Sequence, residues 1–166
     1  MKALVSALAV MAALASSAMA QTALQKTERD ELFLLPKNDP DMAAAMIKAR
    51  ATLAEFLATM KKPTASMRGF AVKVALREGK DLEYVWITPF EKKDGAFSGV
   101  VGNTPRAVRS VKRGQTHDFV EREIVDWLYM DGDKMKGNFT ACPLLKNEPP
   151  AQAKAVIDRL GLDCKF

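Results

Sequence analysis

The apolar residues at the start of the chain form one continuous stretch, whereas later apolar residues alternate with polar ones. Residues 3–15 are apolar apart from Ser6, a single charge (Lys2) precedes them, and the small-residue triplet Ala18-Met19-Ala20 follows. This order is typical of a secretory signal peptide, and the stretch is shorter than the ~20 residues that span a bilayer. We therefore expect a signal peptide over residues 1–20, cleavage after Ala20, and a periplasmic or secreted chain that is soluble and keeps no stable membrane anchor.

A helical period follows an irregular, polar lead-in over residues 21–38. Asp39-Pro40-Asp41 supplies an N-cap carboxylate, a proline suited to the first helical position, and an acid that complements the helix dipole. The apolar residues that then recur at spacings of three and four are Met42, Met46, Ala49, Leu53, Phe56, Leu57 and Met60. Since such spacing marks one buried face, the pattern predicts a helix of about six turns that ends at Lys61-Lys62-Pro63.

From Phe70 onward apolar residues recur at every second position, which is typical of half-buried strands. The segments expected to be strands are residues 70–77, 82–88, 97–101, 116–120 and 134 to about 144. Turns at Glu78-Gly79-Lys80-Asp81 and Asp94-Gly95 separate the first three strands, and the second turn is a strong hairpin signal. Residues 121–130 fit either a helical turn or a strand.

A second helical pattern begins at Pro149-Pro150 and ends at Gly161, which suits a C-terminal cap. Its apolar face consists of Ala153, Val156, Ile157 and Leu160. Strands between two helices indicate the α+β class. We expect a single domain over residues 39–166, with a strongly bent antiparallel sheet of about five strands flanked by an N-terminal and a C-terminal helix.

Cysteine and histidine counts limit the chemistry that this domain can perform. The chain has one His and two Cys, so multi-His metal sites and Cys-rich zinc modules are excluded, and we expect no metal and no cofactor. Asp131-Gly132-Asp133 resembles the start of a calcium loop, but position 142 is Cys where such a loop needs glutamate. In an exported chain, Cys142 and Cys164 are expected to form a structural disulfide, which would stabilise the fold by about 3 kcal/mol.

Positive charge is concentrated in one segment of the chain. Cleavage after Ala20 would remove Lys2 and leave 24 basic residues against 20 acidic ones, a net charge of +4. Four of these cations fall within eight residues: Arg106, Arg109, Lys112 and Arg113. They form either an anion site for phosphate, anionic lipid or an acidic partner, or a solvated connection, which is the more usual role of a charge run. Nucleic acid is disfavoured because the chain is exported and no aromatic residues interleave the charges.

Each of the two tryptophans has a carboxylate nearby in a segment expected to be partly buried. Glu83 precedes Trp86 by three positions, and Asp126 directly precedes Trp127. A buried indole needs an acceptor for its N–H and a buried carboxylate needs donors, so structural pairing explains the pattern. A ligand pocket lined by the tryptophan rings and the two carboxylates also explains it. On the second interpretation, all four residues lie near one another and frame one binding surface.

Several short motifs in this order resemble the YegJ-like family of small bacterial proteins, which carry a domain of unknown function. They are the segments 39–42, 53–57, 70–73, 83–86, 97–100, 103–105, 124–129 and 137–140, and their most specific elements are Asn103-Thr104-Pro105 and Asp126-Trp127. The chain departs from the family pattern at Tyr84, where the family has His, and after Thr140, where Cys142 contributes to the expected disulfide. The resemblance implies the fold and the compartment but no particular activity.

Two classes of function are consistent with these observations. The first is a non-catalytic binding or accessory module of the bacterial envelope, with a macromolecular or anionic partner and no nucleic acid. The alternative is a small periplasmic hydrolase that uses Glu83, Asp126 and His117. The absence of a complete catalytic set favours the module. Convergence of the two carboxylates beside His117 would favour the enzyme, whereas dispersal or full burial would favour the module.

Overall fold

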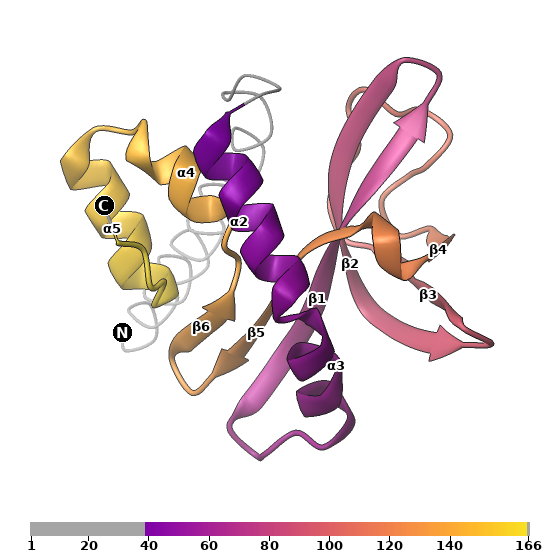
Figure 1. Ribbon diagram of the computed structural model, residues 1–166, viewed down its shortest axis with the longest axis horizontal. Coiled ribbons are helices and arrows are strands. Elements are labelled where there is room, and N and C mark those ends of the chain that lie inside the picture. The colour runs from indigo at the N-terminus through magenta and orange to yellow at the C-terminus, as the bar shows by residue number, and fades with distance from the viewer. Residues whose placement is uncertain (1–38, 166) are drawn as a thin grey trace, which may run out of the picture. The chain divides into compact units, whose positions relative to one another are not determined.

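A computed structural model of the protein describes residues 39–165. The predicted signal peptide over residues 1–20 and the lead-in over 21–38 lie outside the described residues. Within residues 39–165, six strands form one antiparallel sheet, with helices before and after it (Figure 1). The α+β class is therefore confirmed. The sheet has six strands where about five were expected, because the segment that fitted either a helical turn or a strand is mostly a strand.

The first helical segment begins where the sequence predicts. Asp39 caps α2 (Pro40–Ala51), and its carboxylate accepts a hydrogen bond from the backbone N–H of Met42 at 2.8 Å. The single long helix that was expected is, however, divided at Thr52 into α2 and α3 (Leu53–Lys61). The Thr52 hydroxyl donates to the Lys48 carbonyl oxygen at 2.9 Å. Such back-bonding by threonine bends helices, which accounts for the division.

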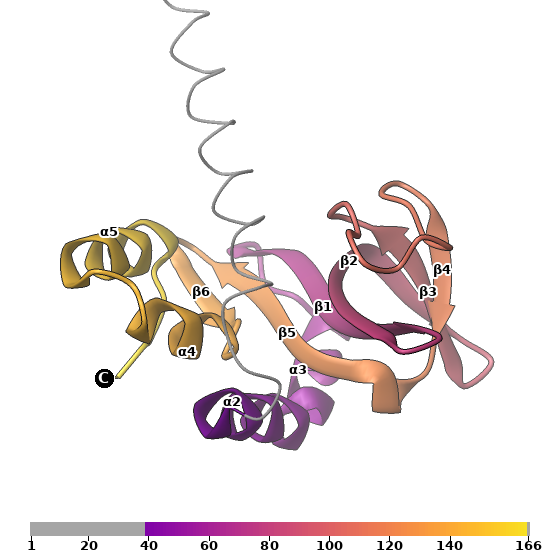
Figure 2. The ribbon, with the colours of Figure 1, turned by 90° about the horizontal axis from the view of Figure 1, so that it is seen from above.

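The sheet has the strand order β4-β3-β2-β1-β5-β6. Its strands are β1 (Met67–Glu78), β2 (Asp81–Lys93), β3 (Ala96–Val101), β4 (Thr116–Phe119), β5 (Ile124–Asp131) and β6 (Lys134–Gly137). A short 3₁₀ turn, Glu121–Glu123, precedes β5. The long strands β1 and β2 curve along their length (Figure 2), and irregular pairing interrupts both the β1–β5 and the β2–β3 ladders. Such irregularities bend sheets.

The pairing of β1 with its two neighbours defines two faces of the sheet. Val72 lies opposite Ile87 and Trp127, and we call the face that carries these residues the inner face. Lys73 lies opposite Trp86 and Asp126 on the outer face. Residues opposite one another share a face, and neighbours along a strand alternate.

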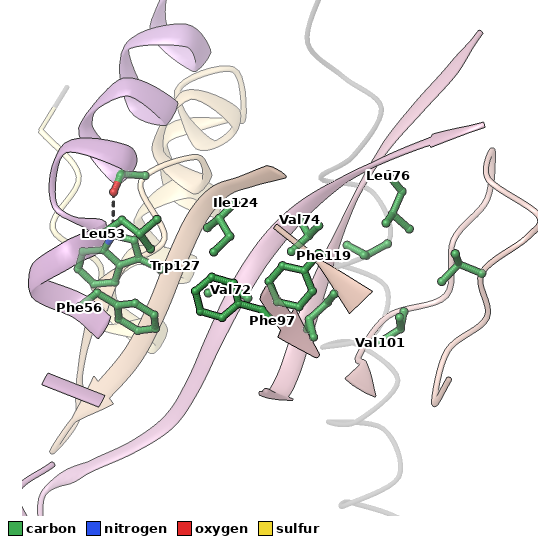
Figure 3. Close-up of a cluster of buried hydrophobic side chains, with 14 of the residues drawn as sticks. Leu53, Phe56, Val72, Val74, Leu76, Phe97, Val101, Phe119, Ile124 and Trp127 are labelled. Carbon is green, nitrogen blue, oxygen red and sulfur yellow. Dashed lines mark hydrogen bonds between the residues drawn. The ribbon is translucent and has the colours of Figure 1, made fainter. Parts of the chain in front are cut away.

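The main hydrophobic core lies on the inner face, against α2 and α3 (Figure 3). Leu53 and Phe56 of α3 are buried there, and the Phe56 ring stacks on the Trp127 indole with centroids 4.8 Å apart. The indole N–H donates to the Ala49 carbonyl oxygen at 3.0 Å. The remaining predicted core residues of the two helices are only half-buried: Met42, Met46, Leu57 and Met60. The buried stripe of these helices is therefore narrower than the sequence period indicated.

The chain after β5 differs most from the prediction. A strand from 134 to about 144 was expected, but β6 ends at Gly137 and the segment continues into the helix α4 (Ala141–Lys146). Gly137 and Asn138 have positive φ angles of 77° and 51°. A Cβ atom at Gly137 would collide with the carbonyl oxygen of Trp127. The chain can therefore turn away from β5 here because position 137 is glycine.

A second, smaller core joins α4 to α5 (Pro150–Leu160). Its buried residues are Ala141, Leu145, Ala153 and Leu162. The predicted Cys142–Cys164 disulfide is present beside this core and spans a Cα–Cα distance of 5.4 Å. Its first cysteine belongs to α4 rather than to a strand. Helix α5 ends as expected, with Gly161 in the left-handed conformation at φ 62°.

Candidate functional site

The four residues predicted to frame one surface are divided between the two faces of the sheet. Glu83 lies opposite Leu76 on the inner face, which also carries Trp127, whereas Trp86 and Asp126 lie on the outer face. Trp86 lies opposite Lys73, and Trp127 lies opposite Val72. Because neighbouring residues of a strand point to opposite faces, the side chains of the two tryptophans extend in opposite directions. A single surface framed by all four residues is therefore wrong, although a binding role for any one of them stays a prediction.

Asp126 is fully buried, with 0% of its surface exposed, and its carboxylate accepts four hydrogen bonds. Three come from backbone N–H groups, of Trp127 at 2.8 Å, Phe139 at 3.3 Å and Thr140 at 2.8 Å. The fourth comes from the Thr140 hydroxyl at 2.6 Å. This carboxylate thus ties the segment between β6 and α4 to β5.

A buried lysine extends the contacts of Asp126. The Lys73 ammonium donates to the Thr140 hydroxyl oxygen at 2.7 Å and lies 4.7 Å from the centre of the Trp86 ring. Thr140 is 1% exposed, and its one hydroxyl proton is donated to Asp126. A nucleophile must be accessible and must transfer its proton to a base during attack. The Lys73–Thr140–Asp126 cluster therefore has the character of an internal hydrogen-bond network rather than that of a catalytic site.

Glu83 is 4% exposed and binds a loop from far along the chain. Its carboxylate accepts hydrogen bonds from the consecutive backbone N–H groups of Arg106 (2.7 Å), Ala107 (2.9 Å) and Val108 (3.0 Å). Successive N–H groups of this kind form a concave anion site, which is occupied here by the protein's own carboxylate. Glu83 therefore shapes the loop that carries the predicted cations.

Glu78 continues the same arrangement at the end of β1. Its carboxylate accepts from the backbone N–H groups of Arg109 at 2.5 Å and Ser110 at 3.3 Å. The loop is also attached to β2 through Asn103, whose side-chain oxygen accepts from the Trp86 backbone N–H at 2.7 Å. Two glutamates of the β1–β2 hairpin thus hold five consecutive backbone N–H groups.

We call residues 102–115, which connect β3 to β4, the basic loop. Its Val108 and Val111 side chains are buried in the main core. The four predicted cations are all exposed: Arg106, Arg109, Lys112 and Arg113. The structure therefore fixes the backbone of the loop from the inside and presents its cationic side chains on the surface.

The three residues of the hydrolase alternative do not converge in the described structure. His117 lies on β4, where it pairs with Gly99, and three strands separate β4 from the β5 strand of Asp126. Glu83 and Asp126 lie on opposite faces, and each accepts hydrogen bonds from three backbone N–H groups. Across residues 39–165, no three His, Cys, Asp or Glu side chains gather where they could hold a metal ion. No helix in this part of the chain is long and apolar enough to cross a membrane.

Sequence reasoning missed Lys73 and Thr140, for different reasons. The predicted turn over 78–81 sets the hairpin pairing, so the position of Lys73 opposite Trp86 was available from the sequence alone. Thr140 was assigned to the strand that begins at Lys134, which ends at Gly137 instead. No local pattern therefore placed its hydroxyl between an ammonium and a carboxylate.

Comparison with known proteins gives one family. The family model described as "Uncharacterized protein conserved in bacteria (DUF2314)" matches residues 39–164, from the cap of α2 to the second cysteine. "Uncharacterized protein YegJ" of Escherichia coli (strain K12) is 35% identical over 112 residues, which are 68% of this chain and 72% of that protein. No solved structure matches the chain. The family model covers nearly the whole described fold, and the chain therefore belongs to the DUF2314 family.

Proposed function

We propose that this protein is an exported, non-catalytic binding module of the bacterial envelope, and that it binds an anionic partner through the basic loop. One observation carries the proposal. Glu78 and Glu83 hold the backbone of the loop in place, while Arg106, Arg109, Lys112 and Arg113 are exposed.

The anchoring matters because a mobile loop loses conformational entropy when it binds a partner, which weakens affinity. Five backbone N–H groups and two buried valines restrain the basic loop before any partner arrives. A solvated connection would need no such restraint, so this arrangement favours the interpretation of the loop as an anion site.

The non-catalytic character is supported by the two buried carboxylates. A general base must reach a proton on the substrate directly or through one water molecule. The Glu83 and Asp126 carboxylates instead accept hydrogen bonds from the protein's own backbone, and both are nearly or fully inaccessible. Nothing in the described residues favours the hydrolase alternative.

Export is the part of the proposal that rests on the sequence of residues 1–20. The Cys142–Cys164 disulfide is compatible with it, since such bonds persist in oxidising compartments. Mass spectrometry of the protein isolated from the periplasm should show a chain that begins at Gln21. A chain that retains Met1 and fractionates with the cytoplasm would contradict export.

The binding role can be tested by capture from envelope extract with the mature chain, residues 21–166. An Arg109→Gln/Arg113→Gln variant should retain roughly fivefold less of the captured component, because each exposed ion pair contributes up to about 1 kcal/mol. Lys61→Gln/Lys62→Gln is the matched control, since it removes the same charge from two exposed residues at the end of α3. Equal capture by both variants would contradict a role for the basic loop.

A further inference from the structure

The β1–β2 hairpin tip and the basic loop lie at one end of the sheet. Glu78, at the tip, binds the backbone of Arg109 and Ser110, and Figure 1 shows both segments at the same end of the sheet. The tip has two exposed cations of its own, Arg77 and Lys80. Segments that are distant in sequence thus contribute to a single basic region, which we call the basic end and define as residues 77–83 and 102–115.

The basic end holds most of the net charge of the described chain. Its 21 residues include six cations and three carboxylates, which gives +3. The rest of residues 39–165 has 15 basic and 14 acidic residues, which gives +1. Residues 39–165 are therefore electrostatically asymmetric, and their field orients an anionic partner towards this end.

The exposed side chains of the basic end are charged or small and polar. Val108 and Val111 are buried, and neither of these two segments contains an aromatic residue. Stable protein–protein interfaces have an apolar core enriched in aromatic residues and methionine, which this end lacks. Binding of single-stranded nucleic acid relies on exposed aromatic residues for stacking, which it also lacks. A surface of many anions recognised by charge alone fits these residues best.

We propose that the basic end binds the headgroups of a bilayer rich in anionic phospholipid, electrostatically and without insertion. The inference rests on the proposed function and names the partner of the same loop, while it adds Arg77 and Lys80 to the site. Arg77 lies on the outer face and the basic loop packs on the inner face, so a bilayer placed across this end of the sheet can engage cations from both segments at once. Each basic residue near such a surface strengthens binding by roughly fivefold.

The test is sedimentation of the mature chain with vesicles of phosphatidylcholine containing phosphatidylglycerol. Vesicles of pure phosphatidylcholine serve as the neutral comparison. We expect binding to the anionic vesicles only, and loss of binding at high salt. The hairpin variant Arg77→Gln/Lys80→Gln should bind at least tenfold more weakly, whereas Lys61→Gln/Lys62→Gln should bind like the wild type. Thermal melting of each variant checks that the fold is intact.

The possible outcomes separate this inference from the proposed function. If the protein ignores anionic vesicles but capture from envelope extract still depends on Arg109 and Arg113, the lipid partner is wrong and the binding module stands. If the hairpin variant binds like the control, the tip does not belong to the site. Tighter binding to inorganic polyphosphate or to duplex DNA than to the vesicles would overturn the lipid assignment in favour of a soluble polyanion.

Discussion

Replacement of Asp126 by asparagine should lower the free energy of unfolding by about 3 kcal/mol or more. The carboxylate accepts four hydrogen bonds in a fully buried position, and bonds to charged groups contribute about 1.5–3 kcal/mol each. Asparagine keeps the volume but turns an NH₂ group towards backbone donors. The cost is increased by the nearby Lys73 ammonium, because removal of one buried charge leaves another less compensated.

Urea denaturation of a chain that comprises residues 21–166 measures this effect. Asp118→Asn is a suitable control, since Asp118 is an exposed residue of β4 and its replacement should change stability by no more than about 0.5 kcal/mol. A normally stable Asp126→Asn protein that no longer captures its partner would instead assign Asp126 to binding. An Asp126→Asn protein that is normal in both assays would remove Asp126 from both roles.

Loss of the Cys142–Cys164 disulfide should have a similarly large effect, confined mostly to one part of the molecule. Replacement of both cysteines by serine should cost about 2–5 kcal/mol. The small core of α4 and α5 is separate from the main core and has only four buried apolar residues. We therefore expect these helices to open locally while β1 and β2 remain protected.

Hydrogen exchange followed by mass spectrometry distinguishes local from global opening. Peptides that cover residues 141–165 should exchange faster in the Cys142→Ser/Cys164→Ser variant, and peptides from β1 should exchange as in the wild type. The reduced wild-type protein is the matched control for the substitutions themselves. A uniform loss of protection across the sheet would show that the two cores unfold as one unit.

The elements that were predicted well have local signals. Asp39-Pro40 marks the start of α2, Asp94-Gly95 marks a two-residue hairpin, and Gly161 marks the end of α5; each signal depends on backbone groups only a few residues away. The spacing of three positions between Glu83 and Trp86 is a local signal of the same kind, because it puts the two side chains on opposite faces of a strand.

The features that were missed depend on partners distant in sequence. The stretch Phe139–Lys146 contains apolar residues and one proline, and so short a run does not distinguish a strand from a six-residue helix. Glu83 was expected to be paired or available to a ligand, but nothing near it indicates that its donors lie 23 to 25 residues away. The pairing of β5 with β1, which sets the face of Trp127, includes an irregularity that no local pattern shows.

The way in which Glu78 and Glu83 hold the basic loop has a consequence for divergence within the family. The bonds are made to backbone N–H groups, which every residue except proline possesses. Most exposed side chains of residues 106–113 can therefore be replaced without loss of the bonds that determine the loop's path. Selection can alter the charge and the size of these exposed side chains while the sheet that supports the loop stays the same. Antibody loops vary in the same way on the conserved immunoglobulin β-sandwich. Relatives with the same two glutamates and differently charged loops would then have the same architecture and different partners.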